Sequence, residues 1–117
     1  MLEPANKRRF DRFSLSLPVE CRSNPGQEDE VVLSSRTENL SLSGLKLNLG
    51  EHAEFKVGDS LELEIDTLRP DGLLLAKGLV RWIGLASGAA KERVAGVELT
   101  SMRPTDWSTW FQILPWI

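Results

Sequence analysis

A repeated alternation of apolar and polar residues constrains the fold of this chain more than any other feature. From Phe13 to Arg22, every second residue is apolar or the lone cysteine, and the residues between are polar or proline. The same period of two appears in GLKLNLG (44–50) and LELEID (61–66). Alternating side chains of a strand point to opposite faces, so these segments predict β-strands with one face in a core.

Three more segments have the composition of strands, and turn residues separate them. They are residues 30–41, 73–83 and 93–100. The dipeptide Pro-Gly in SNPGQED and the dipeptide Asp-Gly in RPDG mark sharp turns. Pro18 cannot donate a ladder hydrogen bond, which predicts an edge or a bulge, and Gly78 predicts a bulge or a bend within its strand. Six short strands at regular spacing predict a mainly β fold, a six-stranded antiparallel barrel.

The period changes from two to 3.6 near the end of the chain. This predicts an amphipathic helix over about 104–114, packed on one opening of the barrel. Its apolar positions are Trp107, Trp110, Phe111 and Leu114. Ser101 or Thr105 is expected to cap the helix, Asp106 suits its first turn, and Pro115 is expected to end it.

Length and composition predict one soluble domain. We expect residues 1–7 to be a flexible arm and 8–117 to be a single domain, with the barrel over about 8–100. No segment resembles a secretory signal or a membrane span, and the single cysteine, Cys21, suits a reducing compartment. We therefore expect a cytoplasmic protein. A pI near 5.2 argues against a DNA or RNA partner.

The sequence lacks the residue sets that catalysis and metal binding require. Its one histidine, His52, lies in a polar segment without a nucleophile or an orienting acid that would make a catalytic set. One histidine and one cysteine cannot complete a zinc site. Glu62, Glu64 and Asp66 alternate along one strand, as residues of a solvated face do. We expect neither an enzyme nor a metal protein.

Two polar segments remain for function. KRRFDR (7–12) concentrates four cations and one acid in a chain of formal net charge -3. Taken alone, it is typical of a solvated tail, but it is rich in arginine, which pairs with phosphates and stacks on planar rings. NLSLSG (39–44) has the composition of a turn. If its backbone is extended, Asn39 and Ser41 share a face, and Gly44 permits a close backbone approach or a left-handed turn.

Together these segments resemble the signature of the PilZ domain, the bacterial receptor module for cyclic di-GMP. Arg8 and Arg12 form RxxxR, and about thirty residues later Asn39, Ser41 and Gly44 match [D/N]xSxxG. The family fold, a six-stranded antiparallel barrel with a C-terminal helix, agrees with the strands predicted above. The resemblance implies a cyclic di-GMP site formed by Arg8, Arg9, Arg12, Asn39, Ser41 and Gly44, with further contacts expected from Lys7, Ser43 and Trp82.

In this resemblance the arginines would contact phosphates and guanine, and Asn39 and Ser41 would hydrogen-bond a guanine. Trp82 has two interpretations, a core side chain or a surface ring against a guanine. In the family, an arginine just before RxxxR favours an intercalated pair of ligands; this chain has Lys7, and we expect one or two ligands per chain, favouring two.

The resulting hypothesis is an adaptor. Cyclic di-GMP would order the arginine arm against the barrel and thereby signal to an output protein, with the chain a monomer or weak homodimer. The main alternative is a ligand-independent interaction module with a partner on the tryptophan-rich helix. A single-stranded nucleic-acid binder and a hydrolase fit the residues less well.

Overall fold

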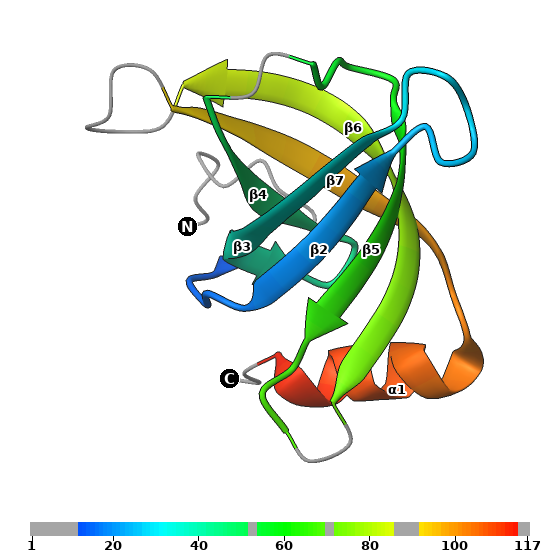
Figure 1. The fold of residues 1–117 in the computed structure, drawn as a ribbon. Helices are drawn as coiled ribbons and strands as arrows, with labels where there is room; N and C mark the ends of the chain where they lie inside the picture. The colour runs from blue at the N-terminus through cyan, green and yellow to red at the C-terminus, as the bar shows by residue number, and fades with distance from the viewer. Residues whose placement is uncertain (1–11, 52–53, 70–71, 86–91, 115–117) are drawn as a thin grey trace.

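In the computed structural model, residues 12–51, 54–69, 72–85 and 92–114 are described (Figure 1). Their elements are β1 (Arg12–Phe13), β2 (Pro18–Ser23), β3 (Val31–Ser41), β4 (Gly44–Gly50), β5 (Ser60–Asp66), β6 (Leu73–Leu85), β7 (Arg93–Met102) and α1 (Pro104–Ile113). All strand pairs are antiparallel.

The six longer strands form a closed ring in the order β3-β2-β5-β6-β7-β4, and pairing between β3 and β4 closes it. The short β1 pairs with the end of β3 outside this ring. Figure 1 shows α1 lying across one end of the barrel. The predicted six-stranded antiparallel barrel with a C-terminal helix is therefore confirmed.

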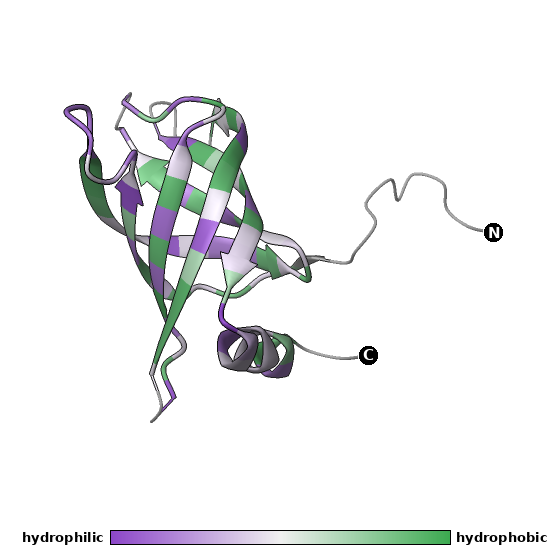
Figure 2. Cartoon of the chain, turned by 90° about the vertical axis from the view of Figure 1, so that its right-hand side faces the viewer, coloured by the Kyte–Doolittle hydropathy of each residue, from purple (hydrophilic) through white to green (hydrophobic). Residues whose placement is uncertain are grey.

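Alternation along the strands places one set of side chains in the core. In β4, Leu45, Leu47 and Leu49 are each at most 1% exposed, whereas Lys46 and Asn48 between them are partly exposed. Figure 2 shows the resulting bands of hydrophilic and hydrophobic residues along the strands. Cys21 belongs to the core, and burial raises the pKa of its thiol to about 12, so it stays protonated and unreactive.

The predicted continuous strand from Phe13 to Arg22 is wrong, because the chain leaves the sheet between β1 and β2. Residues 14–17 are not in a strand. They are tied instead to Thr37 of β3, whose hydroxyl donates to the Leu15 carbonyl at 2.6 Å and accepts from the Leu17 amide at 2.9 Å. This crossing lets β1 reach the far end of β3, beyond the region where β2 pairs.

Replacing Thr37 with Val is expected to destabilise the fold by about 1–3 kcal/mol, because a buried amide and a carbonyl lose their shared partner. Urea unfolding of the purified variant measures this loss. Thr100→Val is the matched control, since Thr100 is an exposed β7 residue and its replacement should change stability little. Equal effects of the two variants would contradict this role for Thr37.

The two residues predicted to interrupt strands behave differently. Pro18 is not at an edge or a bulge; it is the first residue of β2, an internal strand, where pairing with β5 begins only at Val19. Its missing N–H therefore removes no ladder bond to β5. Gly78 is at a bulge, as predicted, because the β6–β7 register shifts between Lys77 and Gly78.

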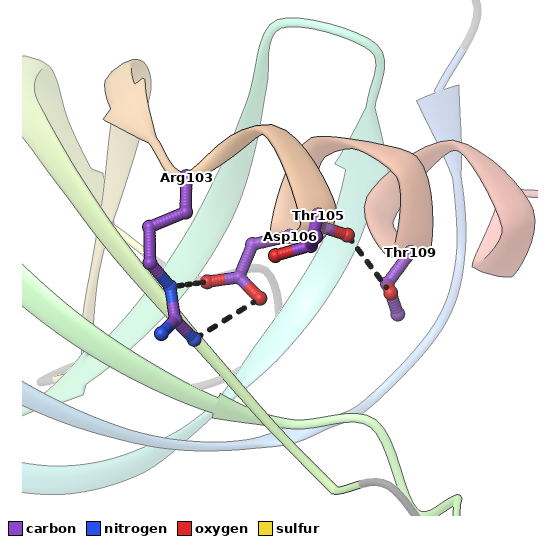
Figure 3. A network of polar contacts seen from close by, with 4 residues as sticks. All are labelled: Arg103, Thr105, Asp106 and Thr109. Atoms are coloured by element: carbon purple, nitrogen blue, oxygen red, sulfur yellow. Dashed lines mark hydrogen bonds and ion pairs between the residues drawn. The ribbon is translucent and has the colours of Figure 1, made fainter.

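The helix begins without the predicted side-chain cap. Ser101 is still in β7, Thr105 is already inside α1, and Arg103, the cap residue, makes no capping hydrogen bond with its side chain. Pro104 occupies the first turn, where its missing N–H has no partner to lose. Asp106 lies in the first turn as predicted, and its carboxylate accepts a hydrogen bond from Arg103 Nε at 2.9 Å (Figure 3). Figure 3 also shows the hydroxyl of Thr109 donating to the Thr105 carbonyl one turn earlier.

The four apolar positions predicted for the helix are buried to different extents; Leu114, the last of them, is the residue after α1. Trp110 and Leu114 are in the core, at 0% and 3% exposure. Trp107 is half-buried and stacks on Phe111 with ring centroids 5.8 Å apart, and Phe111 is exposed. Three of the four predicted apolar positions therefore pack on the core, whereas Phe111 remains at the surface.

Candidate functional site

Strand pairing brings the two polar segments together. In the β1–β3 ladder, Arg12 is the register partner of Ser41, and Phe13 is the partner of Leu40. Arg12 ends the predicted RxxxR, and Ser41 is the serine of NxSxxG. Thus Arg12, the described end of KRRFDR (7–12, the basic segment), runs beside NLSLSG (39–44), which we call the polar turn. Lys7, Arg8 and Arg9 lie outside the described residues, as does His52.

Asn39 and Ser41 lie on the outer face of the barrel wall. Leu40 between them is fully buried in the core, so alternation directs both neighbours away from it. Ser41 is nevertheless buried, and its hydroxyl donates to the Gly44 carbonyl at 3.3 Å. Asn39 is half-buried. Of the two side chains, Asn39 is therefore the more accessible, and Ser41 fixes the shape of the turn.

The C-terminal helix α1 also holds the polar turn in place, through hydrogen bonds from Trp110. The indole N–H of Trp110 donates to the carbonyls of Ser41 and Leu42, at 3.1 and 3.3 Å. On the other side, the Ser43 carbonyl accepts from the Leu99 amide of β7 at 2.9 Å. Core packing of the helix therefore positions the backbone of the polar turn directly.

Gly44 lies where two backbones meet closely. A Cβ on this residue would overlap the Val97 carbonyl oxygen of β7, closer than real Cβ contacts come. Its φ is not among the positive values of the chain, so the required feature is the close approach and not a left-handed conformation.

Gly44→Ala is expected to destabilise the protein by about 1–3 kcal/mol, because the added Cβ would overlap the β7 backbone and push β4 away from β7. The melting temperature of the variant measures the effect. Gly26→Ala is less suited as a control, because Gly26 has a φ of 80°. Gly84→Ala is better, since a Cβ there meets ordinary contacts at 3.6 Å or more. A Gly44 variant as stable as Gly84→Ala would contradict the close approach.

Four residues form a row across four strands on the outer face. Asn39 of β3 pairs with Lys46 of β4, Lys46 pairs with Gly96 of β7, and Gly96 pairs with Trp82 of β6. Trp82 is 41% exposed, so its interpretation as a core side chain is wrong. The sequence analysis missed Lys46 and Gly96. Alternation in GLKLNLG could have indicated that Lys46 points outward, but not which residues lie beside it.

Lys46 supplies a cation to this face. Its ammonium lies 3.8 Å from Glu38, a long ion pair, and its side chain is 30% exposed. Asn48 donates to the other oxygen of Glu38 at 2.9 Å, which keeps the carboxylate in place. An ammonium in a weak, partly exposed pair can turn toward an added anion at small cost.

One hollow in the described part of the surface lies away from the NLSLSG segment. It has a volume of about 380 Å³ on β2, β5 and β6 and is lined by charges of both signs, including Glu20, Arg22, Glu62, Glu64, Lys77 and Arg103. The carboxylates in this lining would repel a doubly charged anion such as a dinucleotide. We therefore take the polar turn, an open surface, as the candidate site. Among the described residues, no cluster of acids, histidine or cysteine could hold a metal ion, and no helix is long and apolar enough to span a membrane.

A family model and several solved structures resemble this chain, and they indicate the same family. The PilZ domain family model matches residues 6–114. Bacillus subtilis MotI/DgrA, an inhibitor of motility, is similar with a TM-score of 0.72 and 22% identity; the match covers 92% of this chain but 48% of MotI. The PilZ domain of Escherichia coli YcgR, solved with c-di-GMP, gives 0.69 and 21%, covering 92% and 88%.

The K. pneumonia MrkH-c-di-GMP complex is also similar, with a TM-score of 0.69 and 14% identity. The match covers 92% of this chain and 51% of MrkH, so this chain spans about half the length of MotI and MrkH. At these identities the likeness shows a shared fold. Among curated proteins, none matches this chain by sequence.

Proposed function

Because the chain belongs to the PilZ domain family, we propose that it is a receptor for cyclic di-GMP. The observation that carries the proposal is the pairing of Arg12 with Ser41, which sets one end of RxxxR beside NxSxxG. Two of the similar structures, those of YcgR and MrkH, contain this ligand. The proposal concerns the barrel and its ligand site, and it does not extend to the additional segments of longer relatives such as MotI and MrkH.

The ligand's chemistry matches the residues of the two motifs. Cyclic di-GMP presents two phosphates and two guanines, whose O6 and N7 atoms accept hydrogen bonds. We assign Arg8 and Arg12 to the phosphates and a guanine Hoogsteen edge, because a guanidinium can bind both in a bidentate manner. Arg9 is an additional phosphate contact, and Lys7 adds positive charge without a planar group.

The barrel surface supplies the other half of the site. Asn39 would hydrogen-bond a guanine with its amide, which offers both donors and an acceptor. Ser41, Ser43 and Gly44 would act mainly by holding the turn, since the Ser41 hydroxyl and the Ser43 carbonyl already have partners within the fold. Trp82 would stack on a guanine from the outer face of β6.

In the finer proposal, the ligand orders the basic arm. Cations in KRRFDR repel one another, and a bound dianion would neutralise them and bridge arm and barrel. Hydrogen exchange measured by mass spectrometry tests this: amides of residues 7–12 should become protected on adding cyclic di-GMP. Protection confined to the barrel would contradict the ordering while leaving binding intact.

The ordered arm would then signal to an output protein, and the protein itself would catalyse no reaction. We propose that it binds two ligands per chain, acts in the cytoplasm, and is a monomer or a weak homodimer. Sedimentation of the protein with and without ligand measures the oligomeric state, and the molar ratio at saturation measures the stoichiometry.

The alternative is a ligand-independent interaction module, favoured by one observation. The Trp107–Phe111 stack leaves Phe111 39% exposed on a helix at the end of the barrel. Aromatic side chains are enriched where proteins bind one another. A complex with a partner that forms without cyclic di-GMP and is lost in Phe111→Ala would favour this alternative.

A further inference from the structure

Gly96 lies in the middle of β7, where an ordinary strand residue would carry a side chain. Its φ is not positive, so the backbone conformation does not demand glycine. The reason is instead a close contact. A Cβ on Gly96 would come within 2.6 Å of three consecutive indole atoms of Trp82, namely Cδ1, Nε1 and Cε2. The indole therefore occupies the space that a side chain at position 96 would take.

These three atoms show how the indole lies. A ring approaching edge-on would bring one atom much closer than its neighbours. Three bonded atoms of the five-membered ring at similar distances mean that the ring face covers the Gly96 Cα. Trp82 starts from β6 and extends over β7, and its side chain remains partly exposed, at 41%. One face of the ring thus contacts the barrel wall.

The ring is aligned with the candidate site. Gly96 is the register partner of Lys46, and Lys46 is the partner of Asn39. The indole over Gly96 is therefore two strands away from Asn39, on the same outer face. Neighbouring strands are about 4.8 Å apart, so this separation is about 10 Å, which a purine base and its hydrogen bond to the Asn39 side chain can bridge together.

We propose that Gly96 is a positioning residue of the ligand site: without a Cβ, it lets the Trp82 indole lie against β7 in a fixed orientation for stacking on a guanine. The inference rests on the proposed cyclic di-GMP function. Stacking requires a ring plane parallel to the base, and a ring supported on one face by the strand loses little freedom when a base covers the other. A side chain at position 96 would push the ring away from the wall.

The test is the affinity for cyclic di-GMP of wild type, Gly96→Ala, Trp82→Ala and the double variant. Each single substitution is expected to weaken binding about tenfold, the effect typical of losing base–aromatic stacking. The double variant should bind no more weakly than Trp82→Ala, because without the indole position 96 has nothing to position. Gly96→Ala with wild-type affinity, or a further loss in the double variant, would overturn the proposal.

Gly84→Ala is the matched control. A Cβ on Gly84 would meet the same indole at Cζ3, but at 3.6 Å, an ordinary contact. Its affinity should stay within about twofold of wild type, as substitutions without steric conflict do. An equal loss in Gly84→Ala and Gly96→Ala would overturn the proposal, since it would mean that any added methyl in this sheet weakens binding.

A spectroscopic measurement on the folded wild type keeps the inference testable if Gly96→Ala does not fold. An indole face over Gly96 should shift one of its α-protons strongly upfield in the NMR spectrum, and Trp82→Ala should abolish the shift. An unshifted proton would overturn the proposal. If wild type bound no cyclic di-GMP, the proposed function and this inference would both fail. If Arg12→Ala weakened binding but Trp82→Ala did not, only this inference would fail.

Discussion

Arg12→Ala is expected to weaken cyclic di-GMP binding by roughly 30-fold or more, the cost of removing one partner from a hydrogen-bonded charge pair. The reason is position as well as charge. Arg12 pairs with Ser41 in the β1–β3 ladder, so the residue is held beside the polar turn. Arg8→Ala should have a similar effect, and isothermal titration measures both.

Arg69→Ala is the control for this pair of variants. It removes the same charge from an exposed position after β5, outside both motifs. Its affinity should match that of wild type at 150 mM salt, where long-range effects of an exposed charge are largely screened. If Arg69→Ala weakened binding as much as Arg12→Ala, net charge and not a specific site would explain the interaction.

Trp110→Ala is expected to lower the free energy of unfolding by about 3–5 kcal/mol, the range for removing a large buried aromatic side chain. Trp110 is fully buried, and its indole N–H donates to the carbonyls of Ser41 and Leu42. The variant should therefore lose both core packing and support of the polar turn. Denaturant unfolding measures the loss, which is a large part of the stability of a domain this size.

Two further tryptophan variants separate these contributions. Trp110→Phe keeps a buried ring but removes the N–H, so it should destabilise less than Trp110→Ala. Trp107→Ala removes a half-buried ring from the same helix and should also cost less. If Trp107→Ala destabilised the protein as much as Trp110→Ala, the helix would not be anchored through Trp110.

The sequence was sufficient for the strands because side chains on a barrel wall must alternate between core and solvent. Leu45, Leu47 and Leu49 illustrate this, since each is buried and the residues between them are not. It was insufficient where partners are distant in the chain. The break after Phe13 depends on hydrogen bonds to Thr37, more than twenty residues away. The predicted side-chain cap is absent because an extended Arg103, followed by Pro104, starts the helix without one.

The candidate site divides in the same way. Spacing alone indicated that Asn39 and Ser41 share a face, but not that Ser41 would be buried against Gly44. The contact of Trp82 with Gly96 follows from the β6–β7 register, which shifts between Lys77 and Gly78 and again between Val80 and Trp82. A sequence pattern does not specify such shifts. The row of Asn39, Lys46, Gly96 and Trp82 across four strands could therefore be seen only in the structure.

The most direct test of the central claim is isothermal titration of the purified wild-type protein with cyclic di-GMP, with GTP and a linear guanine dinucleotide as controls. Saturable binding of cyclic di-GMP, with no comparable binding of the controls, is the predicted result. No heat of binding, together with an unchanged melting temperature at saturating ligand, would contradict the receptor function and leave a barrel whose partner is another protein.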